Sequence, residues 1–102
     1  MNALPVYLFM QAMKGPSNAA FKKAIIACSD ANMMHLEAMT RERYAAFLDE
    51  QNATILANNQ VTTAYWLYQD WGADAKALEL LQSHPFLEVR TILTIFLYIS
   101  LP

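Results

Sequence analysis

The last twelve residues, TILTIFLYISLP, constrain the fold of this chain most, because they carry no charged side chain. Leaving this much apolar surface in water would cost several kcal/mol, at about 25 cal/mol per Å². We therefore expect the segment to be covered by the protein's own core, by another chain or by a lipid surface.

The composition predicts one small domain that has a partner. At 102 residues, the chain is long enough for a single domain over residues 1–102. Hydrophobic residues make up 56% and charged residues only 16%, whereas an average soluble domain has about 25% charged residues. A small domain has much surface for its volume. The few charges therefore favour a homodimer, or a complex with another protein that covers one face.

Several classes of partner and location are disfavoured by the sequence. The net charge is −2, and the seven basic residues are scattered, so we expect no nucleic-acid partner. Neither apolar end reaches the roughly 20 residues that span a bilayer, which makes membrane association improbable. Cys28 is the only cysteine, so no intramolecular disulfide can form and a reducing cytoplasmic location is expected.

Two glycines and four prolines divide the chain into helices. We expect helices at residues 5–14 and 18–28, separated by Gly15-Pro16, with Ser17 as the N-cap of the second. Residues 30–57 contain no glycine or proline and repeat apolar residues at intervals of three and four. That pattern predicts one long amphipathic helix.

The second half is expected to contain shorter helices. Residues 58–60 resemble a turn, followed by helices at 61–71, 75–83 and 86–100. The last of these is apolar almost all round, which is typical of a central or interfacial helix. We see no internal repeat across the whole chain.

The fold prediction is an all-α bundle of four to six helices around the long helix at about 30–57. An α+β alternative remains, because residues 6–10 and 91–99 are rich in β-branched and aromatic side chains and could pair as a small sheet.

One short segment resembles a known repeat family. Tyr68, Gly72, Ala77 and Leu81 have the spacing of the tyrosine, glycine, alanine and large apolar positions of a tetratricopeptide repeat. The resemblance covers fourteen residues, and upstream Val61 stands where that repeat has tryptophan. It implies an antiparallel helix pair across Gly72, and such repeats bind a peptide or a partner helix.

The sequence predicts no catalytic, cofactor or metal site. His35 lies near Glu37 and Glu42, but without the Glu-x-x-His or His-x-x-x-His spacing of metal sites on helices. Cys28 has no catalytic signature around it, and two glycines leave no phosphate-binding loop. We therefore expect a protein that is not an enzyme.

Aromatic side chains are the candidates for a protein interface, because Trp and Tyr dominate interface energetics. They form a dense cluster over residues 65–71 and recur in the last helix, and core packing is the favoured alternative for that cluster. The candidate interface residues are Tyr65, Trp66, Trp71, Phe96 and Tyr98.

The predicted function is therefore protein–protein interaction without catalysis, by a small cytoplasmic helical adaptor, chaperone or inhibitor that occludes or organises a partner surface. One alternative is a structural subunit that assembles with itself through the apolar C-terminal helix. A second alternative is a protein associated with a membrane surface.

Overall fold

The computed structural model describes residues 3–100, and over this range the chain is helical without any strand. The all-α prediction is confirmed. The alternative sheet is wrong, because residues 6–10 and 91–99 both lie within helices, and residues 101–102 of the charge-free run lie outside the described range. The described helices are α1 (Leu4–Lys14), α2 (Asn18–Asp30), α3 (Met34–Glu50), α4 (Thr54–Trp71), α5 (Asp74–Ser83) and α6 (Pro85–Ser100).

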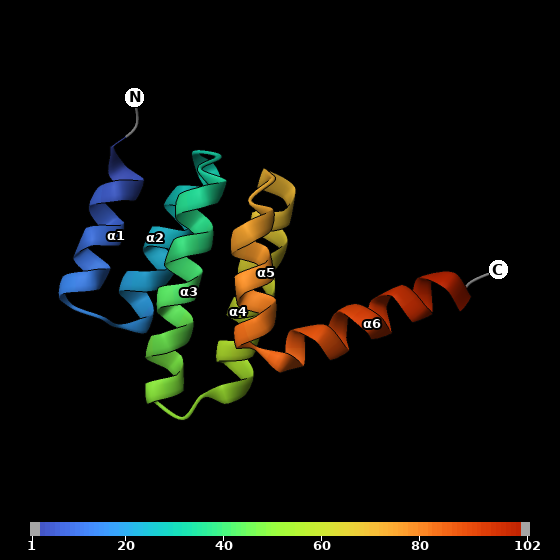
Figure 1. Cartoon of the computed structure of the whole chain (residues 1–102). Helices are drawn as coiled ribbons and strands as arrows, with labels where there is room; N and C mark the ends of the chain where they lie inside the picture. Colours follow the sequence, from blue (N-terminus) through green and yellow to red (C-terminus); the bar gives the residue numbers. More distant parts are fainter. Residues whose placement is uncertain (1–2, 101–102) are drawn as a thin grey trace.

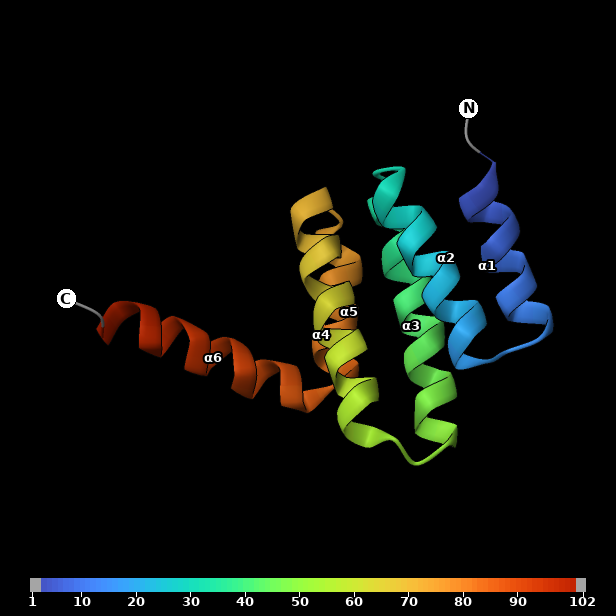
Figure 2. The ribbon, with the colours of Figure 1, turned by 180° about the vertical axis from the view of Figure 1, so that it is seen from behind.

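The first five helices form an array in which each helix packs against the next one in the chain and runs in the opposite direction (Figure 1). In Figure 1, α2 and α4 lie behind α3 and α5, and Figure 2 shows the same two layers from the other side. The most extensive contact is between α3 and α4. In contrast, α6 leaves the array and extends away from it, touching chiefly α5.

Three turns of the same geometry, twenty residues apart, connect α2 through α5. Asn32, Asn52 and Gly72 each have a positive φ, of 56°, 61° and 87°. In each turn the N–H of the next residue donates to a carbonyl five residues earlier, which satisfies one carbonyl at the helix C-terminus. These bonds are Met33 to Cys28 at 2.9 Å, Ala53 to Leu48 at 2.9 Å, and Ala73 to Tyr68 at 2.8 Å.

The second of these turns corrects the prediction of one long helix at about 30–57. The chain reverses at Asn52, between the end of α3 and the start of α4. Asparagine adopts the left-handed conformation more readily than most residues, so the helix ends here without glycine or proline. The turn expected at residues 58–60 is also wrong, because these residues lie within α4.

Burial follows the same twenty-residue interval, although no repeat is evident in the sequence. Four residues before each positive-φ position, Cys28, Leu48 and Tyr68 are buried between the helices. Five residues after two of these positions, Ala57 and Ala77 are buried, and their small side chains allow neighbouring helices to approach closely. The backbone conformation and the pattern of burial therefore repeat every twenty residues, whereas the residue types do not.

Polar side chains add specific links between the helices. The Tyr44 hydroxyl donates to Asn18 Oδ1 at 3.0 Å and joins α3 to α2. Arg41 donates to Glu37 Oε2 at 2.9 Å within α3, and to Gln60 Oε1 at 2.8 Å on α4. Pairing Glu37 in this way is important because its side chain is almost wholly buried, and a buried charge without a partner is costly.

Candidate protein interface

The helix α6 is an apolar arm held to the array at its first turn. Pro85 begins the helix, where a missing N–H costs no hydrogen bond. Leu87 is buried with only 1% of its surface exposed, and the ring of Phe86 makes an edge-to-face contact with His84, with 5.9 Å between centroids. Beyond this turn, every apolar side chain described on α6 is more than half exposed: Val89, Leu93, Ile95, Phe96, Leu97, Tyr98 and Ile99.

Two of the predicted interface residues lie on this arm. Phe96 and Tyr98 are both strongly exposed, and Tyr98 reaches 82%. The sequence feature that suggested them, aromatic side chains in an apolar C-terminal helix, therefore coincides with a strongly exposed apolar part of the described chain.

The aromatic cluster at 65–71 divides between core and surface. Tyr65 is 6% exposed and belongs to the core, and its hydroxyl accepts a hydrogen bond from Gln69 at 3.0 Å. Trp66 is partly exposed and makes an edge-to-face contact with Tyr65 at 5.2 Å. Trp71 is also exposed and lies against the ring of His35, with 4.7 Å between centroids.

The structure does not bring the five candidates together. Trp71 lies at the C-terminal end of α4, whereas α6 starts at the opposite end of the array (Figure 1). The arm therefore presents Phe96 and Tyr98 without Trp71. Sequence spacing could not separate Tyr65 from Trp66, because adjacent helical positions differ by about 100° and only the packing of α4 decides which one faces inward.

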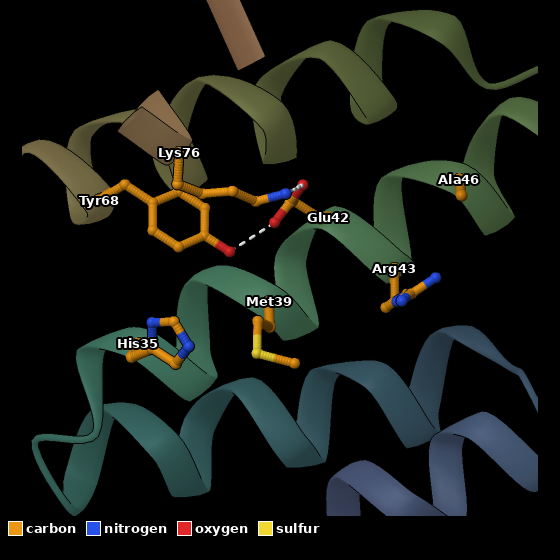
Figure 3. Close-up of a pocket in the computed structure, with 7 residues that line it drawn as sticks. All are labelled: His35, Met39, Glu42, Arg43, Ala46, Tyr68 and Lys76. Carbon is orange, nitrogen blue, oxygen red and sulfur yellow. Dashed lines mark hydrogen bonds and ion pairs between the residues drawn. The ribbon is translucent and has the colours of Figure 1, made fainter. Parts of the chain in front are cut away.

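A hollow of about 520 Å³ between α3, α4 and α5 is the second feature with possible binding chemistry (Figure 3). Within it, the Tyr68 hydroxyl donates to Glu42 Oε2 at 2.5 Å, and Lys76 Nζ lies 3.3 Å from Glu42 Oε1. The lining residues are His35, Met39, Glu42, Arg43, Ala46, Tyr68 and Lys76.

Burial and the Glu42 carboxylate determine how tightly Tyr68 and Lys76 hold their protons in this hollow. Burial raises the pKa of Tyr68 far above its usual value, and the hydrogen bond to Glu42 raises it further. Burial by itself lowers the pKa of Lys76, but Glu42 and Glu79 outweigh this effect and the net pKa is raised. The three groups are thus a neutral hydroxyl, a carboxylate and an ammonium that satisfy one another, an arrangement that ties helices together.

Sequence reasoning did not find this cluster. Tyr68 and Glu42 are 26 positions apart, and only the turn at Asn52, which places α4 against α3, brings them into contact. No spacing rule available before the fold was known connects them.

Cys28 lies apart from these features, in the core. It is fully buried, and this burial raises the pKa of its thiol, with smaller opposing and supporting effects from Thr40 and Glu37. A buried thiol with a raised pKa is a poor nucleophile.

Neither a membrane-spanning helix nor a metal-binding cluster is found in the described part of the chain. Over residues 3–100, no helix combines the length and hydropathy needed to cross a bilayer. Among the side chains described there, no three His, Cys, Asp or Glu residues gather closely enough to hold an ion.

Comparisons with protein-family models, with curated proteins and with solved structures found no match to this chain. The antiparallel helix pair that residues 68–81 led us to expect is present: α4 and α5 are antiparallel and meet at Gly72, and Ala77 is buried.

Proposed function

We propose that this chain is a non-catalytic protein-interaction protein, an adaptor, chaperone or inhibitor, that docks a partner protein through α6. The observation that carries the proposal is the exposure of α6. Its apolar side chains from Val89 to Ile99, where described, are each more than half exposed on a helix that extends from the array.

The energetics of burial favour docking of this arm. Each apolar side chain of this size gains about 1.5–3 kcal/mol when it moves from water into a packed contact. The arm is already helical, so less ordering entropy is lost on binding than for an unfolded segment. An amphipathic helix that inserts into a groove is a recurring mode of protein recognition.

A protein partner is favoured over a lipid surface by the charges on α6. Helices that lie in a membrane interface usually carry several Lys or Arg residues on the polar face. The first turn of α6 holds the acidic Glu88, and Arg90 is the one basic residue between positions 85 and 102. Electrostatic attraction to anionic lipid would therefore be weak.

The proposal is tested by placing a photoreactive phenylalanine analogue at position 96 in cells that produce the full chain. The matched control carries the analogue in place of Ile26, a similarly exposed apolar residue on α2. We expect a discrete protein adduct from position 96 and none from position 26. Adducts with lipid alone, or the same weak adducts from both positions, would overturn the proposal.

A further inference from the structure

We infer that the partner of α6 is a second copy of this chain, and that α6 packs against the outer face of that copy's α1. This inference rests on the function proposed above, since it names the partner of the same arm. The two surfaces are called the α6 seam, consisting of Val89, Leu93, Phe96 and Ile99, and the α1 face, consisting of Val6, Tyr7, Met10 and Met13.

The α1 face is an exposed apolar surface on a helix that is otherwise packed on α2. All four of its side chains are exposed to at least 43%, whereas Pro5 and Ala12 on the opposite side of α1 are buried. Tyr7, Met10 and Met13 follow one another at intervals of three positions, so their side chains form a continuous strip along the helix.

The α6 seam has the spacing of a helix–helix contact. Val89, Leu93 and Phe96 are separated by four and three positions, the intervals that place side chains on one stripe of a helix. Ile99 follows three positions later, and each of the four side chains is more than half exposed. Two such stripes can interdigitate along their length.

The helices that carry these surfaces, α1 and α6, lie on opposite sides of the molecule, as both views show (Figures 1 and 2). Packing α6 onto α1 of the next copy would join the two arrays, with the second turned by the steep angle at which α6 leaves α5 (Figure 1). Since neighbours within the array alternate in direction, we place α6 antiparallel to that α1. The 11 residues of α1 fit within the 16 residues of α6.

The charged residues near the ends of α1 and α6 favour antiparallel packing. Glu88 lies in the first turn of α6, and Lys14 lies in the last turn of α1. Antiparallel packing brings these two turns together, so the carboxylate of one copy faces the ammonium of the next. Both residues are exposed in the single chain.

The available area is sufficient for a reversible contact. Taking roughly 150–200 Å² for each of the four side chains, the exposed part of the α6 seam is on the order of 450 Å². Apolar atoms form about 60% of a typical interface, so this seam corresponds to roughly 750 Å² for each copy. A standard stable interface buries about 800 Å² per partner.

A second copy of the chain would cover the exposed apolar surfaces of both α1 and α6. Stacked helical arrays need polar outer faces on their terminal units to remain soluble, and here α1 and α6 both present apolar side chains instead. A head-to-tail contact covers both surfaces with one interface. Because it joins two different surfaces, this contact generates open chains or rings, and the smallest ring is a pair of molecules that exchange their α6 helices.

The test uses two full-length variants, Met10→Glu on the α1 face and Phe96→Glu on the α6 seam, in sedimentation velocity experiments over a range of concentrations. The unmodified chain should form dimers or larger assemblies as concentration rises. Each variant alone should associate at least about tenfold more weakly, because a charge enters an apolar contact. An equimolar mixture should form a 1:1 complex and nothing larger, since each variant retains one intact surface.

Charge reversal gives a second, milder pair of variants in case either glutamate disturbs folding. Lys14→Glu and Glu88→Lys should each weaken self-association by about two- to fivefold, and the chain carrying both changes should recover it. Circular dichroism and thermal unfolding of each variant check that the monomer is intact. If neither single reversal changes association, the antiparallel contact with α1 is wrong.

Failure of this inference can be distinguished from failure of the proposed function. An unmodified chain that stays monomeric at every concentration, or a Met10→Glu variant that assembles normally, overturns the inference. If the photoreactive analogue at position 96 then captures a different protein, the proposed function stands without it. If that analogue captures no protein, both fail.

Discussion

Tyr68 on α4 donates a hydrogen bond to Glu42 on α3 at 2.5 Å, and the second oxygen of the same carboxylate lies 3.3 Å from Lys76 on α5. The Glu42 carboxylate therefore connects the three consecutive helices α3, α4 and α5. Tyr68 has no exposed surface, and its ring lies 5.9 Å from the Lys76 ammonium. The relative positions of α3, α4 and α5 thus depend on a polar contact as well as on apolar packing.

Replacing Tyr68 with phenylalanine should lower the free energy of unfolding by about 1–3 kcal/mol, because the buried side of the Glu42 carboxylate loses its donor. Urea denaturation in a background carrying Phe96→Glu, which removes the assembly contact proposed above, measures this change. The control is Tyr98→Phe, which removes a hydroxyl from a residue that is 82% exposed and should leave stability unchanged. Equal effects of the two substitutions would show that the Tyr68–Glu42 bond contributes nothing.

Stability should decrease in alkaline solution. Burial and Glu42 raise the pKa of Tyr68 above its ordinary value near 10, so the folded state holds this proton more tightly than the unfolded state. As the pH rises above about 10, the unfolded state loses the proton first and the free energy of unfolding falls. The raised pKa of Lys76 acts in the same direction.

Denaturant titrations at neutral pH and at a series of pH values above 10 measure this dependence. The Tyr68→Phe variant should show a shallower alkaline decrease than the unmodified chain, and Tyr98→Phe should show the same decrease. A slope that is identical in all three proteins would contradict the assignment to Tyr68.

Replacing Asn52 or Asn59 with glycine should change the free energy of unfolding in opposite directions. Asn52 has a φ of 61°, and Asn52→Gly should raise the free energy of unfolding by up to about 1 kcal/mol, because glycine adopts this conformation without strain. Asn59 lies within α4, and Asn59→Gly should lower it by a few tenths to about 1 kcal/mol, since glycine disfavours a helix interior. Thermal unfolding of the two variants shows whether each substitution stabilises or destabilises the protein. A stabilising effect of Asn59→Gly would support the turn at 58–60 that the sequence predicted.

Leucines on the same helix should differ sharply in their contribution to stability. Leu87 is buried at the base of α6, whereas Leu97 is mostly exposed further along. In a background carrying Phe96→Glu, which removes the assembly contact proposed above, Leu87→Ala should cost about 2–4 kcal/mol. Leu97→Ala should cost less than about 0.5 kcal/mol. Similar costs for both, measured by urea denaturation, would indicate that α6 packs on its own array.

Local sequence signals predicted most helix ends correctly. The Ser17 side chain accepts a hydrogen bond from the N–H of Ala20 at 3.1 Å and caps α2 as expected. Gly72 has the left-handed conformation that ends α4, and Pro85 begins α6. In each case one residue and its immediate neighbours supply the physical reason, so no knowledge of the fold was needed.

Asn52 shows where local signals were insufficient. Asparagine is compatible with a helix interior and with a left-handed turn, and the two conformations differ in free energy by only about 1–2 kcal/mol. Packing of α4 against α3 decides between them, because reversal at Asn52 buries Leu48, Ala57 and Val61 in one core. Asn59, the same residue type seven positions later, remains helical for the same reason.

The sequence by itself determined that the chain is helical, that helices end near residues 15, 72 and 85, and that an apolar C-terminal segment needs a cover. These properties depend on backbone preferences and on side-chain hydropathy, which act over a few residues. Tertiary structure alone decided that Tyr65 is core and Trp66 is surface, that Glu42 joins Tyr68 to Lys76, and that α6 extends from the array with Phe96 and Tyr98 exposed. Those outcomes depend on which helix faces meet, and residues distant in sequence determine that through the volume and polarity they place at each contact.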